Sequence, residues 1–147
     1  MTQQFSRFSL ISILMLLVVS CGNDDDDRRR NPFVTTFSFS VPLDLNLPQY
    51  SNLQFPGNVV VDNNLGLRGV IIYNLNNEQY LAWEATDPSH IPETCSRLEV
   101  DGLTVRCMCN DGNEYSLVTG QPLGDTQEFG LINYAAIRTG NVLTISN

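Results

Sequence analysis

Three cysteines and one histidine in the second half of the chain are the residues best able to do chemistry. Cys95, Cys107 and Cys109 carry sulfur, and His90 is the only imidazole in the sequence. Thiolate and imidazole can bind zinc or an iron–sulfur cluster. Outside the cytoplasm, paired thiols oxidise to disulfides. Because three is an odd number, at most one internal disulfide forms among them and one thiol is left over.

The composition excludes several kinds of site. The 147 residues include no Lys, so a Schiff base and a P-loop are both excluded. A single His rules out a metal centre built on two or three imidazoles. Eight Arg against sixteen acidic residues give a net charge of −8. This balance argues against a nucleic-acid partner, because such binding depends on neutralising phosphates.

No constellation typical of an enzyme is evident, so none is expected. The sequence has no Gly-x-Ser-x-Gly elbow, and a hydrolytic triad would have to use His90. Cys107 and Cys109 lack the two-residue spacing of thioredoxin-like sites. A zinc pocket of Glu84, Asp87 and His90 would need Glu93 or Cys107 as a further ligand. The simpler interpretation of His90 is a surface imidazole in a proline-containing loop.

The amino-terminal segment has the features of an export signal. Arg7 is the one charged residue before Cys21, and residues 8–20 are mostly apolar. These thirteen residues are too few for a spanning helix, which needs about 20. Residues 18–20 (Val-Val-Ser) precede Cys21, and Gly22 follows. This pattern resembles the lipobox of bacterial lipoproteins, which implies that residues 1–20 are removed and Cys21 is acylated, palmitate included. The alternative is a buried helix with an ordinary thiol at Cys21.

Residues 21–32 are predicted to form the lipidated cysteine and a charged tether. Four Asp are followed by three Arg, and nothing in this stretch could be buried. The acidic run resembles surface-export signals of some double-membraned bacteria, whereas a plain hydrophilic spacer would look the same. We expect a lipid-anchored protein of the cell envelope, at the outer membrane and facing either the periplasm or the cell surface.

Residues 33–147 are predicted to form one mainly β domain. Apolar residues alternate with polar ones over residues 33–47, which predicts a strand with one buried face. Pro42 places that strand at a sheet edge or at a kink. Shorter apolar runs separated by turn residues predict the other strands: 58–61, 68–73, 79–84, 103–107, 114–118, 131–138 and 142–146.

Two cysteine-bearing loops separate the strands of residues 68–147. The first contains Asp87, His90 and Cys95, and the second spans residues 107–112 (Cys-Met-Cys-Asn-Asp-Gly). Residues 115–124 then read Tyr-Ser-Leu-Val-Thr-Gly-Gln-Pro-Leu-Gly. This order resembles the Rieske family, whose aromatic-x-Leu-x-Thr-Gly-x-Pro-Leu-Gly pattern the last stretch matches. The resemblance implies an antiparallel β-sandwich of small sheets.

Rieske proteins hold a [2Fe–2S] cluster with two Cys on one iron and two His on the other. In the family the first loop carries Cys-x-His and the second Cys-x-x-His. Here Asp87 stands at the first Cys position, and His90 follows one residue later than the pattern. Cys107 matches the second Cys, while Asn110 stands at the second His position. The resemblance therefore makes these four vestigial or alternative ligand positions, and we expect no bound cofactor.

Many Rieske domains also carry a second Cys in each loop, and the two are joined beneath the cluster. By this resemblance Cys95 pairs with Cys109. The competing pair is Cys95–Cys107, favoured if the strand leading to Cys107 runs beside the first loop. Either disulfide would close a loop of about 12–14 residues and add roughly 3 kcal/mol to the free energy of unfolding in the chain-entropy model.

Two functions remain open at this point. The first is a membrane-anchored Rieske-like module that has lost its cluster and serves in binding or structure. Its partners would be the membrane, through the lipid, and a protein or ligand whose identity the sequence leaves open. The second is an electron-transfer protein with an atypical [2Fe–2S] cluster held by His90, Cys95, Cys107 and Cys109, with Asp87 in reserve.

Overall fold

The computed structural model describes residues 31–147, apart from residues 36 and 126, and residues 31–147 form one compact unit. The signal segment, Cys21 and nearly all of the tether lie outside the described residues. The predictions made for them therefore stay predictions. Within the described part, no helix is both long enough and apolar enough to cross a membrane.

Nine strands and two short 3-10 helices make up the regular structure of the described residues. All the strand pairs are antiparallel, which confirms the mainly β prediction and agrees with the antiparallel sheets that the Rieske resemblance implies. In chain order the elements are β1 Ser40–Asp44, η3 Ser51–Gln54, β2 Val59–Asp62, β3 Val70–Asn74, β4 Tyr80–Glu84, η4 Thr94–Ser96, β5 Leu98–Asp101, β6 Thr104–Cys107, β7 Glu114–Ser116, β8 Asn133–Thr139 and β9 Val142–Ser146.

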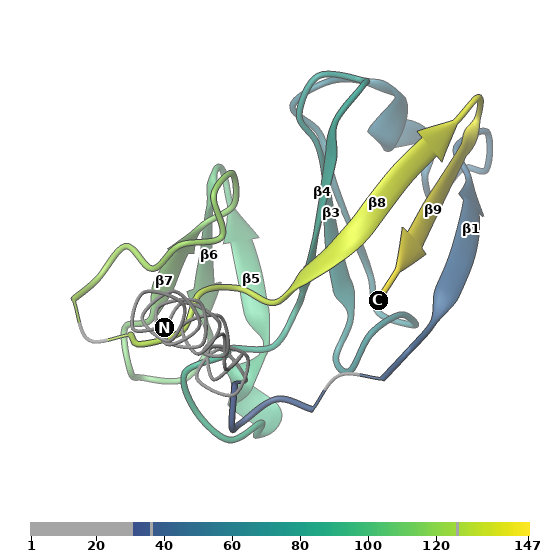
Figure 1. The fold of residues 1–147 in the computed structure, drawn as a ribbon. Helices are drawn as coiled ribbons and strands as arrows, with labels where there is room; N and C mark the ends of the chain where they lie inside the picture. Colours follow the sequence, from purple (N-terminus) through teal and green to yellow (C-terminus); the bar gives the residue numbers. More distant parts are fainter. Residues whose placement is uncertain (1–30, 36, 126) are drawn as a thin grey trace, which may run out of the picture. The chain divides into compact units, whose positions relative to one another are not determined.

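The strands form a six-stranded and a three-stranded sheet. The larger has the order β1-β9-β8-β4-β3-β2, and the smaller has the order β5-β6-β7 (Figure 1). β1 lies at the edge of the larger sheet, where Pro42 faces Thr144 of β9. An edge is where a residue without an N–H is tolerated.

Two details of the strand prediction are wrong. The strand expected over residues 33–47 is confined to Ser40–Asp44, because the chain turns after Asp44 and its carboxylate accepts from the Asn46 backbone N–H at 2.9 Å. β5 at Leu98–Asp101 was not among the predicted runs. It is short, and only Leu98 and Val100 mark its apolar face.

The core consists of two apolar clusters, and the central strand β3 contributes to both. Val70 and Ile72 pack into the first cluster, while Ile71 and Tyr73 pack into the second. Successive residues of a strand point to opposite faces, so β3 is buried on both sides. The second cluster joins the larger sheet to Leu98, Val105 and Tyr115 of the smaller one. The smaller sheet is thus fixed to the rest by side-chain packing.

Trp83 of β4 explains a glycine in the Rieske-like stretch. Its indole N–H donates to the Leu117 carbonyl at 2.8 Å. A methyl group at Gly120 would come within 2.6 Å of the Trp83 ring, and Gly120 also has a positive φ of 69°. Only glycine satisfies both conditions without displacing the ring. Trp83 is buried.

Two loops at one end of the smaller sheet carry the chemistry. We call residues 85–97, between β4 and β5, the first loop, and residues 108–113, between β6 and β7, the second loop. An isolated bridge between Thr86 and Arg97 closes the first loop at its base. The Met108 N–H donates to the Arg97 carbonyl at 3.2 Å. The two loops therefore meet at their backbones as well as through side chains.

Candidate functional site

A disulfide between Cys95 and Cys109 ties the first loop to the second. This is the pairing implied by the Rieske resemblance, and the competing Cys95–Cys107 bond is not formed. Cys107 is left as the free cysteine of the described part of the chain, and it is buried. With a sequence separation of 14, the cross-link is worth about 3 kcal/mol in the chain-entropy model.

The carboxylate of Asp87 organises the first loop from inside the protein. Asp87 is fully buried. Its Oδ1 accepts from the Tyr115 hydroxyl at 2.6 Å and from the Ser89 N–H at 2.8 Å. Its Oδ2 accepts from the Asn113 amide at 3.0 Å. A buried carboxylate is tolerated when its oxygens are paired in this way, so Asp87 links the first loop to β7 and to the second loop.

Tyr115 is held neutral by the same contacts. Burial raises the pKa of Tyr115 well above its usual value, and the hydrogen bond to Asp87 raises it further because a phenolate could not donate to that carboxylate. The phenol oxygen also lies 2.8 Å from the Ser89 hydroxyl. Three polar groups therefore form a closed network under the first loop.

His90 turns one ring nitrogen toward the second loop. Its Nδ1 lies 2.9 Å from the Ile91 carbonyl, which accepts only from a protonated nitrogen. The Nδ1 nitrogen is therefore used inside the first loop, and Nε2 is the nitrogen free to face the second loop. Nε2 lies 3.4 Å from Cys107 Sγ and 3.2 Å from Asp111 Oδ2. Asp87 Oδ2 lies slightly further from it, at 3.6 Å.

Cys107, the last residue of β6, lies beneath His90. The Cys109 N–H donates to its sulfur at 3.4 Å. Burial is the main reason that its pKa is raised to about 12, and the neighbouring Asp87 and Asp111 carboxylates add to the rise, while the Cys109 N–H opposes it. In the metal-free protein Cys107 is therefore a thiol.

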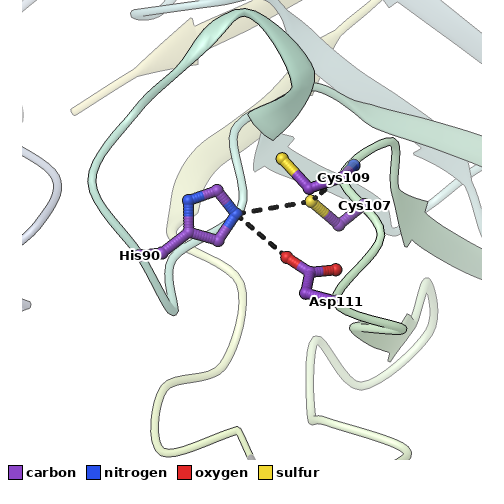
Figure 2. Close-up of side chains that lie close together, drawn as sticks. All are labelled: His90, Cys107, Cys109 and Asp111. Atoms are coloured by element: carbon purple, nitrogen blue, oxygen red, sulfur yellow. Dashed lines mark hydrogen bonds and ion pairs between the residues drawn. The ribbon is translucent and has the colours of Figure 1, made fainter.

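Four potential ligand atoms converge at this point. Those of His90, Cys107, Cys109 and Asp111 all lie within 4.8 Å of one another. Figure 2 shows the His90 ring pointing at Cys107 and Asp111, with Cys109 beside Cys107. Cys109 is already bonded to Cys95. An imidazole, a thiol and a carboxylate thus remain available, all near one end of the smaller sheet.

The structure brings together three of the four positions implied by the Rieske pattern. Asp87, His90 and Cys107 are neighbours, whereas Asn110 is exposed and makes none of the side-chain hydrogen bonds found in the described residues. The next residue, Asp111, is the one whose carboxylate lies near His90, at 3.2 Å from Nε2.

Two residues considered for a zinc pocket with His90, Glu84 and Glu93, have other roles in the structure. Glu84 is fully buried elsewhere, and its carboxylate accepts from the Leu67 N–H at 2.7 Å and the Tyr134 hydroxyl at 2.7 Å. Glu93 begins η4 as part of a capping box with Ser96. The interpretation of His90 as a plain surface imidazole is also wrong, because its side chain is only 28% exposed and both nitrogens have partners.

Three residues of the site were missed from the sequence. Neither Asp111 nor Tyr115 was singled out as a site residue from the sequence. Asn113 drew no attention, although its amide reaches Asp87. An available signal was the density of Asp and Asn in the second loop, because several short polar side chains beside a cysteine can turn back toward a neighbouring loop.

Comparison with known proteins gives few matches. No family model matches the chain, and neither does any curated protein. A chain in a solved complex of reduced oxygenase and oxidized ferredoxin in carbazole 1,9a-dioxygenase is 18% identical, with a TM-score of 0.47 and coverage of 74% of this chain and 92% of that one. The ferredoxin of carbazole 1,9a-dioxygenase from Nocardioides aromaticivorans is 14% identical, with a TM-score of 0.42 and coverage of 62% and 86%.

A third solved structure, the small subunit of a nitrite reductase (NADPH) oxidoreductase protein, is 19% identical to this chain. Its TM-score is 0.40, and the match covers 76% of this chain and 98% of that one. Such similarities do not assign a function to the chain.

Proposed function

We propose that this protein is a lipid-anchored module of the cell envelope whose Rieske-like domain has lost its cluster and now serves in binding or structure. A disulfide and a buried carboxylate take over the task of holding the two loops together. The observation that carries the proposal concerns Asp87, which stands where the first cysteine ligand of Rieske proteins belongs. Its carboxylate oxygens accept hydrogen bonds from Tyr115, Ser89 and Asn113.

The residues present do not fit a [2Fe–2S] cluster. Such a cluster needs two ligands on each of two irons, and these pairs lie on opposite sides of the cluster. Here the donor atoms of His90, Cys107 and Asp111 converge on one point. Cys95 and Cys109 are bonded to each other, so neither sulfur is a thiolate. These features support the loss of the cluster over an atypically ligated one.

The anchor and location are part of the same proposal. Cys21 follows an apolar segment and a lipobox-like sequence, which supports acylation there. Two or three acyl chains would hold the protein stably, because each buried methylene supplies about 0.8 kcal/mol. The charged tether then places the β domain away from the bilayer, at the outer membrane and facing the periplasm or the cell surface.

The experiment follows the anchor and the cluster separately. The full chain is expressed in a double-membraned bacterium fed with radiolabelled palmitate, purified in detergent under anaerobic conditions, and examined by visible absorption. We expect label in the wild type, none in Cys21→Ser, and a colourless protein in both. Visible iron–sulfur bands with equal amounts of iron and acid-labile sulfide would contradict the loss of the cluster and favour electron transfer. Equal palmitate labelling of the wild type and Cys21→Ser would contradict the anchor.

A further inference from the structure

Among the described residues, the one free thiol, the histidine and one carboxylate lie close enough together to bind a single metal ion. We propose that His90 Nε2, Cys107 Sγ and the Asp111 carboxylate form a site for one borderline-soft divalent cation of the zinc type. The inference rests on the proposed loss of the cluster, because a [2Fe–2S] group would need the same sulfur. It differs from the family's ligand pattern in using Asp111 and a single ion.

Two of the three distances between donors match a single tetrahedral ion. Zinc binds His nitrogen and Cys sulfur at about 2.0–2.3 Å, so donors around it lie about 3.3–3.8 Å apart. His90 Nε2 lies 3.4 Å from Cys107 Sγ and 3.2 Å from Asp111 Oδ2. The remaining pair of donors, Cys107 Sγ and the Asp111 carboxylate, lies within 4.8 Å. The loops that carry these donors are already fixed by the Cys95–Cys109 bond.

The hydrogen bonding around His90 also leaves a place for a cation. Because Nδ1 donates to the Ile91 carbonyl, Nε2 is the nitrogen that faces the carboxylates of Asp111 and Asp87. Facing acceptors repel one another unless a proton or a metal ion lies between them. A ligating His whose other nitrogen donates to a backbone carbonyl is the usual arrangement in metal sites.

The charges and the open position define what the site would hold. One thiolate and one carboxylate neutralise a divalent cation, and the Asp87 carboxylate adds further negative potential from the interior. Cys109 is taken by its disulfide, so the protein supplies three ligands. The fourth position is left to water or to a small anionic or nitrogen ligand, as in zinc sites that keep an open position.

Cobalt(II) is the probe, because a Co²⁺–thiolate bond gives a near-ultraviolet charge-transfer band that zinc and oxygen-only sites lack. The full chain in detergent is titrated with Co²⁺ at neutral pH without reductant, and Zn²⁺ is then added. We expect one equivalent to produce the band and Zn²⁺ to abolish it. Cys107→Ser should remove the band, and Asp111→Asn should weaken binding at least tenfold.

The matched control is Asp101→Asn, the same substitution at an exposed carboxylate that pairs with Arg106. It should bind Co²⁺ like the wild type, and the fluorescence of Trp83 reports whether each variant is folded. The proposal is overturned if no band forms, or if the band survives in Cys107→Ser. It is also overturned if Asp111→Asn and Asp101→Asn bind equally well. Failure here leaves a colourless, cluster-free protein and so differs from failure of the proposed function.

Discussion

Replacing Asp87 with Ala should destabilise the domain far more than removing the other carboxylate of the site. The substitution removes a fully buried carboxylate that accepts three hydrogen bonds. The donors that lose this acceptor are the Tyr115 hydroxyl, the Ser89 N–H and the Asn113 amide. Hydrogen bonds to a charged group contribute about 1.5–3 kcal/mol each. Part of this is offset because the variant no longer buries a charge, so we expect a loss of about 3–5 kcal/mol in the free energy of unfolding.

Asp111→Ala is the matched control for Asp87. The Asp111 side chain is 28% exposed, and it contacts His90 and the Asn113 N–H. Water can replace these contacts, so the cost should be about 1 kcal/mol or less. Because a loss of 5 kcal/mol can unfold a small domain, Tyr115→Phe serves as a milder probe. It removes one of the three bonds and should cost about 1–2 kcal/mol.

Urea unfolding followed by the fluorescence of Trp83, the one tryptophan, measures all three variants. Its indole lies in the cluster between the two sheets, so the signal reports on the domain that carries the loops. If Asp87→Ala and Asp111→Ala differ by less than about 1 kcal/mol, Asp87 does not hold the loops together and the reasoning is refuted.

Three further predictions concern other parts of the domain. Gly120→Ala should destabilise it by about 2–4 kcal/mol because the added methyl meets the Trp83 ring, whereas Gly112→Ala, also at positive φ but with open space around it, should cost only about 1–2 kcal/mol by urea unfolding. Thr86→Val should raise the midpoint of thermal unfolding, because the Thr86 hydroxyl is buried without a hydrogen-bond partner in the described residues; a lower midpoint would show that a partner exists. Burial and the bond to Glu84 raise the pKa of Tyr134, so above pH 10 the unfolded tyrosine loses its proton while the folded one keeps it. Stability should therefore fall as pH rises past 10, and Tyr134→Phe should flatten that slope in urea titrations; an unchanged slope would contradict it.

Much of the fold follows from local sequence patterns. Alternating apolar residues and the turn residues between them identify most strands, and Pro42 identifies an edge. The pattern fails over residues 33–47, where alternation continues beyond the strand because apolar side chains outside a strand can also pack inward: Leu45 is buried although it lies just past the end of β1. β5 was missed because a four-residue strand offers only two apolar side chains.

The site was less predictable than the fold, because its contacts join residues far apart in sequence. Asp87 and His90 were expected near Cys107 from the Rieske resemblance. That Asp111 rather than Asn110 faces His90 depends on which way the second loop turns, and neighbouring polar residues in a turn give no such direction in sequence. Two of the three partners of Asp87, Asn113 and Tyr115, lie 26 and 28 residues away, and no local pattern marks them.

The most direct test of a cross-linked, cluster-free site is the intact mass of the full chain after unfolding and alkylation without reductant. We predict one alkyl group from Cys107 in the palmitate-labelled chain, because Cys95 and Cys109 are bonded and lipid blocks Cys21. Reduction before alkylation should raise the count to three. Three alkyl groups without reduction would mean that all the sulfurs of the loops are free to bind a cluster, and the proposed role of the disulfide would be wrong.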